Sequence, residues 1–374
     1  MKKWENISDY LFFQEGPGVR NHQYTTDGIK LLNVANLVNG RVDLSTSERY
    51  ISSDEAYGKY KHFLADEGDL IIASSGIKVD YFDKKMGFIR KEHLPICMNT
   101  STIRFKSIDK SKLDINYFMY YLKSQSFKDQ LSKQITGSAQ LNFGPSHLKK
   151  MEFPIVDIEE QSSINSVLGN IQSQIRLKEE QLTEYDQLIK SRFVEMFGDV
   201  NLRKKQNNWI KLGEITEIIT GTTPSTTDKS NWGGDNLWIT PAELNENSFY
   251  VHDTERKLTE KGLRSKSLSI MPVGTVLLST RAPIGKTAIV GNPMSCNQGF
   301  KNFICNDCLN PVYLYSLLKY NIEYLNSIGT GTTFKEISKS TVANIEIPVP
   351  NITVQNHFAQ FVKQVDKLKF EDDF

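Results

Sequence analysis

Two short stretches of the sequence carry residue types that could perform chemistry. Gly285-Lys286-Thr287 has the ending of a phosphate-binding loop, in which backbone amides and the lysine hold a nucleotide. That loop also requires a glycine where Thr280 stands, and Pro283 lies inside it, so a turn between two strands explains the stretch better. Cys305-Asn-Asp-Cys308 could supply two zinc ligands, but one such pair without a second Cys or His pair is a poor zinc site.

The other candidate chemistry in the sequence is weaker. It contains no HExxH or GxSxG motif and no paired carboxylates flanking a lysine, and its histidines are scattered singly. Gly329-Thr-Gly-Thr-Thr lacks the later glycine and the helix of a dinucleotide fingerprint, although its hydroxyls and Lys335 would suit phosphate oxygens. We therefore predict no catalytic residue, no metal and no bound cofactor in this chain.

One long helix is the element around which the rest of the chain is organised. Across residues 159–198 the apolar positions recur at alternating steps of four and three, which is the heptad pattern of a coiled coil. They are Ile164, Leu168, Ile171, Ile175, Leu182, Tyr185, Ile189 and Met196. Gly198 stands where a glycine would end the helix. At about 1.5 Å per residue the stripe spans roughly 50 Å. Such a stripe needs a partner helix, and an ordinary long core helix is the alternative.

The sequence also contains an internal repeat that supplies this partner. With a shift of 194 residues, the segment 137–161 lies on 331–355 without a gap, so that Pro154 meets Pro348 and Gln161 meets Gln355. The helix after the second copy repeats the apolar stripe with Phe358, Phe361, Val365 and Leu368. A repeat of this length is stronger evidence about architecture than any local motif.

The repeat continues upstream and predicts the fold class. GDLIIASSG from Gly68 resembles GTVLLSTR from Gly274, and PICMN from Pro95 resembles PMSCN from Pro293. Alternating apolar runs predict strands at 29–34, 69–73, 102–105, 238–240 and 275–279, and amphipathic segments predict single helices over 115–135 and 311–326. We expect α+β domains at 1–150 and 201–350, separated by a helix at 151–200 and followed by a shorter helix at 351–374, with the two helices as partners.

Composition narrows the class of protein. A chain of 374 residues with 39% hydrophobic content can hold two domains. No run of 18 apolar residues and no secretion signal is present, which favours the cytoplasm. The net charge of +1 hides an uneven distribution. Residues 1–150 hold 22 basic against 17 acidic residues and 201–350 hold 16 against 13, whereas 151–200 hold 4 against 10. Two mildly basic domains are thus separated by an acidic helix.

With the duplicated glycine loop, the segments MEFPIVDIEEQ and IEIPVPNITVQ, and the heptad helices after them, the chain resembles the specificity subunits of type I restriction-modification enzymes. The resemblance covers nearly the whole chain. It implies two target-recognition domains that each read half of a split sequence in double-stranded DNA, held apart by an antiparallel coiled coil that binds two methyltransferase subunits. It also implies that restriction subunits join the complex, and that S-adenosylmethionine, ATP and Mg are used by the partners, while this chain is not catalytic.

If the domains read DNA, polar loop residues must make the contacts. Arg, Lys, Asn and Gln can read base edges, while hydroxyls and amides hold phosphates. The candidates in the first domain are Arg20, Asn21, Ser75, Lys78, Asn99, Ser138 and Gln140. The candidates in the second domain are Thr223, Ser225, Arg281, Lys286, Asn297, Gln298, Thr332 and Lys335. A solvated loop is the alternative explanation for any one of them.

Two further expectations concern the helices and the competing functions. The repeat maps Phe374 onto Glu180, so the second helix is the shorter one, which bears on how tightly a second methyltransferase subunit is held. A protein-binding coiled-coil adaptor and an enzyme in its own right are the competing classes. Salt-sensitive binding to one split DNA sequence would distinguish the first prediction from the adaptor, and turnover by the isolated chain would support the enzyme.

Overall fold

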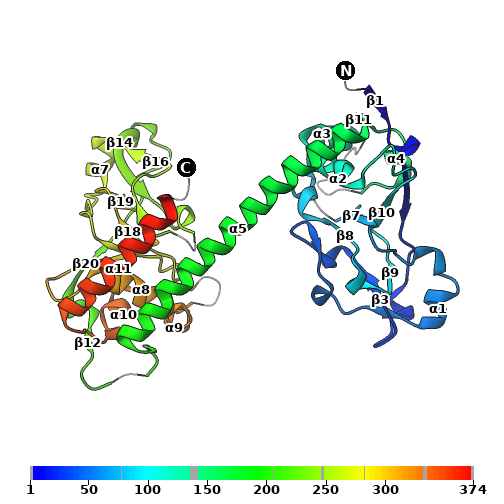
Figure 1. Ribbon diagram of the computed structural model, residues 1–374. Coiled ribbons are helices and arrows are strands. Elements are labelled where there is room, and N and C mark those ends of the chain that lie inside the picture. Colours follow the sequence, from blue (N-terminus) through cyan, green and yellow to red (C-terminus); the bar gives the residue numbers. More distant parts are fainter. Residues whose placement is uncertain are drawn as a thin grey trace. The chain divides into compact units, whose positions relative to one another are not determined.

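The computed structural model describes residues 3–76, 78–134, 142–204, 206–245, 248–281, 283–331 and 335–371. The chain divides into two compact units, Met1–Arg176 (unit 1) and Leu177–Phe374 (unit 2). The division falls inside the longest helix, α5 (Ile158–Phe197), so each unit holds one half of it (Figure 1). The four-part boundaries given above, at residues 150, 200 and 350, stay a prediction.

Unit 1 combines short strands with helices. Its described residues form a four-stranded sheet of order β2-β10-β7-β8, a three-stranded sheet of order β6-β3-β9, and the pairs β1-β11 and β4-β5. The strands are β1 (Lys3–Asn6), β2 (Leu11–Glu15), β3 (Ile29–Leu32), β4 (Leu37–Val38), β5 (Arg41–Val42), β6 (Tyr50–Ile51), β7 (Leu70–Ala73), β8 (Met86–Phe88), β9 (Ile96–Met98), β10 (Thr102–Ser107) and β11 (Glu152–Ile155). The helices before α5 are α1 (Ser53–Tyr57), α2 (Ile115–Lys123), α3 (Gln125–Gln134) and α4 (Pro145–Leu148).

Unit 2 also combines short strands with helices. Its described residues form a five-stranded sheet of order β13-β20-β17-β18-β15, a three-stranded sheet of order β16-β14-β19, and the pair β12-β21. The strands are β12 (Ile210–Lys211), β13 (Thr216–Thr220), β14 (Trp232–Ile239), β15 (Tyr250–Val251), β16 (Arg256–Leu258), β17 (Val276–Leu278), β18 (Thr287–Val290), β19 (Ser295–Cys296), β20 (Lys301–Cys305) and β21 (Glu346–Ile347). The helices are α6 (Leu212–Ile215), α7 (Glu260–Ser265), α8 (Pro311–Tyr320), α9 (Ile322–Ile328), α10 (Lys339–Ala343) and α11 (Ile352–Glu371).

The two units repeat each other in the strand order of their sheets, apart from β15 and the pair β4-β5, and this confirms the predicted internal repeat. The order β2-β10-β7-β8 corresponds to β13-β20-β17-β18. In each three-stranded sheet the middle strand pairs antiparallel with one neighbour and parallel with the other, β3 with β6 and β9, and β14 with β16 and β19. The α+β fold class is therefore confirmed.

A buried glutamine anchors the start of each long helix in the same way. Gln161 and Gln355 are both 0% exposed. The amide of Gln161 donates to the carbonyls of Lys112 and Val156, both at 2.8 Å, and accepts from the backbone N–H of Asp114, the residue that caps α2. Gln355 makes the equivalent three bonds to Cys308, Pro350 and Asn310, the cap of α8.

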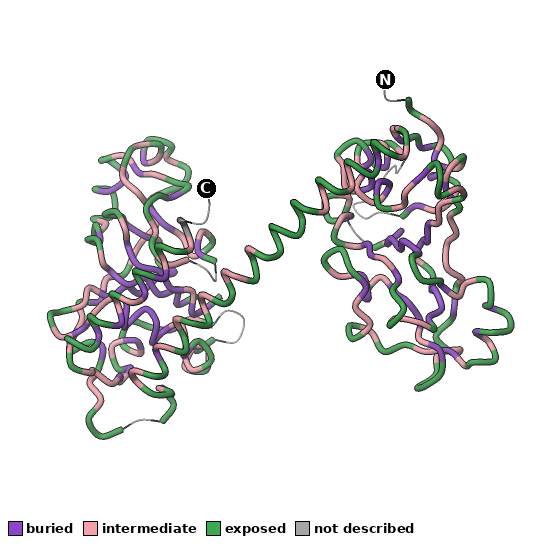
Figure 2. Tube along the Cα trace, in the orientation of Figure 1, coloured by how far each residue is buried: buried purple, intermediate pink, exposed green. Residues whose placement is uncertain are grey.

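Apolar strands form the core of each unit. Strands β7 and β17 are buried along their whole length, as their continuous runs of Leu, Ile, Val and Ala require. In unit 1, β7 packs in the same core as aromatic side chains of α2. In unit 2, β17 packs in the same core as α8, in which seven consecutive residues are buried. Figure 2 shows the buried residues gathered inside each unit, while the middle of α5 is exposed.

Two predicted single helices are each broken in two. The helix predicted over 115–135 stops at Ser124, whose ψ of 153° is extended, and resumes as α3. The helix predicted over 311–326 stops at Asn321. The side chain of Asn321 accepts from the Leu202 N–H and donates to the Val200 carbonyl, and these bonds outside the helix compete with helical geometry. Ser124 accepts from the Phe127 N–H at the start of α3, and Asn321 bonds to a segment distant in the sequence, and periodicity detects neither.

Helix α11 runs antiparallel to the C-terminal half of α5 within unit 2, as predicted for the coiled coil (Figure 1). The Phe358 ring lies 5.5 Å from the rings of Phe193 and Phe197 near one end. Near the other end, Lys369 Nζ lies 2.6 Å from Asp186 Oδ1. Residue numbers thus rise along one helix as they fall along the other. The chain turns away after α5 at Gly198, whose φ is +79° and whose N–H donates to Val194.

The apolar stripe of the helices is covered unevenly. Phe193, which was not assigned to the stripe, is 2% exposed and stacks on Tyr313. The stripe residues Ile164, Leu168, Leu182, Tyr185, Ile189, Met196 and Phe361 are partly buried, and Phe358 and Val365 are buried. Ile171 and Ile175 are 47% and 55% exposed, and Leu368 is 45% exposed. Part of the stripe is therefore open to solvent in this chain.

Candidate nucleic-acid interface

In unit 1, four loops meet at one end of the larger sheet. Gly16, directly after β2, donates its N–H to the Thr102 carbonyl at 2.9 Å. Ser74, directly after β7, donates to the Ser101 carbonyl at 2.8 Å and accepts from the Phe143 N–H at 3.0 Å. We call residues 16–21, 74–76, 99–101 and 142–144 loop cluster 1. Backbone hydrogen bonds bring these four segments together although they lie far apart in the sequence.

Unit 2 builds a corresponding cluster, in which the two bonds of Thr280 are equivalent to those of Ser74. Thr222, after β13, donates its N–H to the Cys296 carbonyl at 3.0 Å. Thr280, after β17, donates to the Gly299 carbonyl at 2.8 Å and accepts from the Ile337 N–H at 2.9 Å. We call residues 221–225, 279–281, 297–299 and 335–337 loop cluster 2. The repeat predicted from the shift of 194 residues therefore extends to the hydrogen bonds of the loops.

A glycine permits the close approach of two loops in each cluster. A Cβ atom on Gly16 would lie 2.1 Å from the Asn99 carbonyl oxygen, and one on Gly221 would lie 2.1 Å from the Cys296 carbonyl oxygen. No real Cβ contact is that short, so each loop could carry a side chain there only by moving away. The two glycines hold equivalent places at the ends of β2 and β13.

Most predicted residues of the first domain lie in or beside loop cluster 1. Arg20 and Asn21 are exposed where a short 3-10 helix, Asn21–Gln23, begins. Ser75 is partly buried and bridges to Asn142, and Lys78 is exposed at the cap of the following 3-10 helix. Ser138 and Gln140 lie outside the described residues.

Asn99 differs from its neighbours because its side chain is committed to the fold. It is 2% exposed, its Nδ2 donates to Asn33 Oδ1 at 2.8 Å, and its Oδ1 accepts from the Thr100 N–H at 2.8 Å. A side chain that already satisfies its hydrogen bonds internally has little left for a base. We therefore give Asn99 a structural role and leave it out of the proposed contact surface.

The predicted residues of the second domain divide in the same manner. Thr223 donates to the exposed Gln298 at 2.6 Å, Ser225 is exposed beside it, and Lys335 is exposed. By contrast, Lys286 lies in the turn between β17 and β18, and its Nζ donates to the carbonyls of Pro241 and Leu244. That turn is the one expected for Gly285-Lys286-Thr287, and it leaves the lysine structural. Thr332 lies outside the described residues.

Charged groups within loop cluster 2 hold one another in place. Glu336 accepts from Arg281 Nε at 3.0 Å and lies 3.5 Å from Nζ of the buried Lys301. Asn297 uses its Oδ1 to accept from the Gly299 N–H at 2.9 Å. The side chain of Arg281 therefore stays about half exposed while its Nε is held by Glu336.

In unit 1, Glu15 ends β2 beside loop cluster 1, and burial raises the pKa of its carboxyl group.

Four residues beside the clusters were not found from the sequence. Tyr24 and Arg49 form an arginine-aromatic contact in unit 1, and Trp232 and Arg256 form one in unit 2. The sequence around a single arginine does not show that its side chain will contact an aromatic ring. Arg49 and Arg256 can be matched to each other only through strand register, because the segments that carry them differ in length between the two units.

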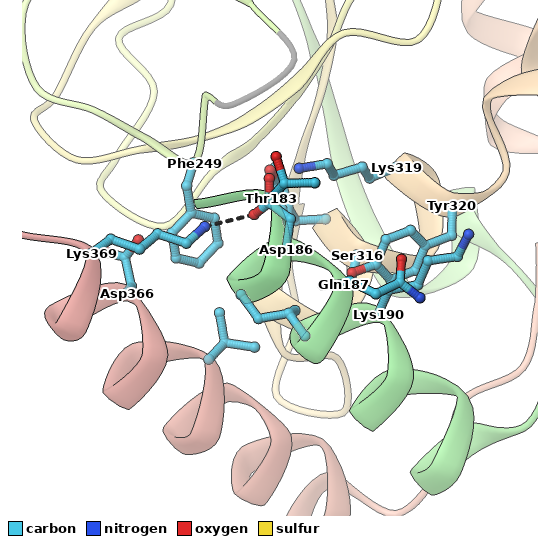
Figure 3. Close-up of a pocket in the computed structure, with 13 residues that line it drawn as sticks. Thr183, Asp186, Gln187, Lys190, Phe249, Ser316, Lys319, Tyr320, Asp366 and Lys369 are labelled. Carbon is cyan, nitrogen blue, oxygen red and sulfur yellow. Dashed lines mark hydrogen bonds and ion pairs between the residues drawn. The ribbon is translucent and has the colours of Figure 1, made fainter. Parts of the chain in front are cut away.

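A cavity of about 300 Å³ in unit 2 is lined by α5, α8 and α11 (Figure 3). Its wall combines the carboxylates Asp186 and Asp366 with the amines of Lys190, Lys319 and Lys369. The Lys369–Asp186 ion pair closes one side. The cavity has neither the glycine-rich loop nor the helix start that holds a phosphate. It therefore belongs to the packing of the helix pair.

The described part of the chain holds no group of three His, Cys, Asp or Glu side chains arranged to bind a metal ion. Burial raises the pKa of the Cys305 thiol to about 12, and Cys308 Sγ contacts Asn306 Oδ1 at 3.0 Å. Zinc is bound by thiolates, so this environment does not favour it. None of the helices searched among the described residues is long and apolar enough to cross a membrane.

Comparison with known proteins assigns both units to one type of domain. The family described as type I restriction modification DNA specificity domain matches residues 23–185 and again residues 204–372. The MjaIX specificity subunit of a type I restriction enzyme from Methanocaldococcus jannaschii is 41% identical over 186 residues, which cover 48% of this chain and 43% of the relative. The EcoR124I/EcoR124II specificity subunit from Escherichia coli is 25% identical over 196 residues, which cover 46% of this chain and 48% of the relative.

These two alignments thus span about half the length of the relatives. Among solved structures, the S subunit of a type I restriction-modification system from M. genitalium superposes with a TM-score of 0.59 at 16% identity, over 99% of this chain and 91% of the other. At that identity the likeness concerns the fold alone. It covers both units.

Proposed function

Because the chain belongs to the family of type I restriction-modification DNA specificity domains, we propose that it is the subunit that reads a split DNA sequence for such an enzyme. Each unit reads one block of base pairs through its own loop cluster, and the bases between the blocks are not read. The chain itself is not catalytic in this proposal.

The observation that carries the proposal is the duplication of the loop cluster. Two units that share strand order, loop hydrogen bonds and a close-approach glycine present two surfaces of the same construction. An adaptor for unrelated proteins would have no need of two equivalent polar loop surfaces. A reader of two separate blocks of DNA needs one such surface for each block.

The exposed side chains of the clusters have the chemistry that DNA requires. Arg20 and Lys78 in unit 1 and Lys335 in unit 2 are exposed cations that suit phosphate oxygens. Asn21 and Gln298 are exposed amides that can pair with a base edge through one donor and one acceptor. The excess of basic residues in 1–150 and 201–350 supports the placement of DNA on the two domains.

The partners follow from the same proposal. Two methyltransferase subunits bind the acidic helices, and restriction subunits complete the complex in the cytoplasm. S-adenosylmethionine, ATP and Mg are used in those partners. The partly exposed stripe of α5, with Ile171 and Ile175, is an apolar surface of the kind that a protein partner covers.

Selection of bound sequences from a random DNA pool tests this function. The purified chain, with its methyltransferase subunit, is expected to enrich two short blocks at a fixed spacing, with affinity that falls steeply as salt rises. Lys78→Ala and Arg281→Ala should each weaken binding or relax preference at one block. Enrichment of no sequence by a well-folded complex would support the adaptor instead, and unchanged binding by both variants would remove these two residues from the interface.

A further inference from the structure

The smaller sheet of each unit carries an exposed arginine at the same register position. Leu31 of β3 pairs with Cys97 and its N–H donates to the carbonyl of Arg49, which lies directly before β6. Trp238 of β14 pairs with Ser295 and lies opposite Arg256 of β16. Cys97 and Ser295 hold the same place in the matched segments PICMN and PMSCN. Arg49 and Arg256 are therefore equivalent residues of the repeat.

In unit 2 the guanidinium of Arg256 lies over an indole ring. Its Cζ atom is 3.5 Å from the centroid of the Trp232 ring and 5.3 Å from that of Trp238. The two indoles contact each other edge to face, with centroids 5.0 Å apart. Such stacking fixes the plane of the guanidinium and leaves its N–H edge free to point outward.

The same two indoles are hydrogen-bonded to the first segment of loop cluster 2. Trp232 Nε1 donates to the Ser225 carbonyl at 3.0 Å, and Trp238 Nε1 donates to the Thr222 carbonyl at 3.1 Å. The stacked arginine is thereby held beside the loop that carries the predicted residues Thr223 and Ser225. It forms part of the same surface.

Unit 1 repeats the arrangement with a smaller ring. The Cζ atom of Arg49 lies 5.3 Å from the centroid of the Tyr24 ring. The Tyr24 hydroxyl in turn accepts from Asn99 Nδ2 at 3.5 Å, which places the ring against the turn at 99–101 of loop cluster 1. An arginine on an aromatic ring beside the loops is thus a property of both units.

Neither guanidinium is neutralised within the described part of the chain. Arg49 and Arg256 are exposed, and no described carboxylate or carbonyl accepts from their side chains. The acidic side chain nearest in sequence to Arg256 is that of Glu255, and the Asp253 carboxylate close by is paired with Lys257 at 2.9 Å. By comparison, Arg104 and Arg281 are paired with carboxylates. An arginine oriented by an aromatic ring and left with free donors is ready to bind an external acceptor.

We propose that Arg49 and Arg256 each read a guanine, one in each block of the DNA target. The inference rests on the proposed function and deepens it by naming the base and the residue. A planar guanidinium offers two parallel N–H donors, which match the O6 and N7 acceptors of guanine in the major groove. A phosphate can accept the same bidentate pair but carries no sequence information, whereas the adjacent acceptors O6 and N7 distinguish guanine from the other bases.

Lysine substitutions separate these two uses of the arginine. Arg256→Lys and Arg49→Lys keep the charge but lose the planar pair of donors. Each variant, in the full chain with its methyltransferase subunit, is put through the same selection from a random DNA pool. The matched controls are Arg264→Lys in unit 2 and Arg41→Lys in unit 1, both exposed arginines away from the aromatic rings. Melting temperatures establish that all variants are folded.

We expect Arg256→Lys, whose ammonium makes a less directional contact with O6 and N7, to weaken the preference for guanine at one position of one block by some part of the roughly 5- to 150-fold that a bidentate contact is worth, and to leave the other block unchanged. Arg49→Lys should do the same to the other block, and the controls should enrich the wild-type sequence. A wild-type split sequence that both lysine variants retain in full would overturn the inference while the function stands. An equal loss of affinity for every sequence would identify a phosphate contact and also overturn it. If the wild-type complex enriches no split sequence, the proposed function itself fails.

Discussion

The close approach of Gly16 to the Asn99 carbonyl shows how one residue shapes a recognition surface. No side chain can be placed at Gly16 without moving loop cluster 1, because its Cβ would lie 2.1 Å from that oxygen. Two residues further on, Gly18 has open space around it. Substitutions at Gly16 and Gly18 therefore distinguish a steric requirement for glycine from a general effect of glycine in a loop.

Gly16→Ala is expected to lower the free energy of unfolding by about 1–3 kcal/mol or more, since the loops must separate to admit the methyl group. Gly18→Ala is the control and should change it by less than about 0.5 kcal/mol. Urea unfolding of both variants measures the difference. Equal stability of the two would show that the approach of the loops is not constrained by this glycine.

Sequence reasoning located the loops better than it assigned the role of each residue in them. Ser75 and Arg281 were matched by the repeat, and each makes the equivalent bridge, to Asn142 and Glu336. Asn99 and Lys286 have suitable side chains, but their hydrogen bonds are used inside the fold. Whether a polar loop residue faces inward depends on contacts between distant segments, which a single sequence does not display.

At the scale of elements, each long helix starts from a buried glutamine that ties it to the cap of an earlier helix. The three hydrogen bonds of Gln161 and those of Gln355 connect equivalent partners in the two units. These residues matched in the sequence repeat, but only the structure shows why. A glutamine in a polar helix start gives no sign of being buried until the position of α2 or α8 is known.

Gln161→Ala and Gln355→Ala are each expected to lower the free energy of unfolding by about 1–3 kcal/mol, because buried backbone groups lose their partners. The exposed Gln360 supplies the control, since Gln360→Ala breaks no buried hydrogen bond. Thermal unfolding followed by circular dichroism measures all three. A loss no larger than that of the control would contradict the anchoring role.

The pairing of α5 with α11 depends on Phe358 far more than on Phe361. Phe358 is 0% exposed among the rings of Phe193 and Phe197, whereas Phe361 is only partly buried and lies 5.7 Å from the Arg192 guanidinium. Phe358→Asp places a charge in an apolar site and should cost several kcal/mol. Phe361→Asp places its carboxylate beside Arg192 and should cost much less. A fall in melting temperature that is equal for both would contradict this difference.

The carboxylate of Asp366 makes the helix pair sensitive to pH. Burial raises its pKa, Lys369 lowers it and Asp186 raises it further. The folded state therefore binds the Asp366 proton more tightly than the unfolded state, and stability from this group falls as pH rises above the ordinary aspartate pKa of about 3.9. The other charged groups that face the cavity are Lys190 and Lys319.

Asp366→Asn removes the free-energy cost of burying the ionised Asp366 carboxylate, so the variant should melt at a higher temperature than the wild type at pH 7. The difference should shrink as pH falls toward and below about 4, where both states of the wild type become protonated. Thermal unfolding of the two proteins across this pH range measures it. A variant that is less stable than the wild type at pH 7 would show that the carboxylate is held by favourable ion pairs instead.

For the whole molecule, duplication is the property that sequence predicted most fully. The shift of 194 residues anticipated two α+β units, matched loops and two long helices, because the segment 137–161 and its copy align without a gap and share residues such as Gly137, Pro154 and Gln161 at fixed spacing. The sequence did not predict the breaks at Ser124 and Asn321 or the stacked arginines, because these depend on helix capping, on hydrogen bonds to distant segments and on strand register. Those features became visible only when strands distant in the sequence were paired.

The most direct test of the account is made in cells. The chain is co-expressed with the methyltransferase subunit that the proposed function assigns to it, and the host DNA is sequenced for methylated adenines. We expect methylation at one sequence made of two short blocks with a fixed unread gap. Methylation at a single continuous sequence would contradict the claim that two units read separate blocks, and an assembled complex that methylates no sequence would contradict the proposed function.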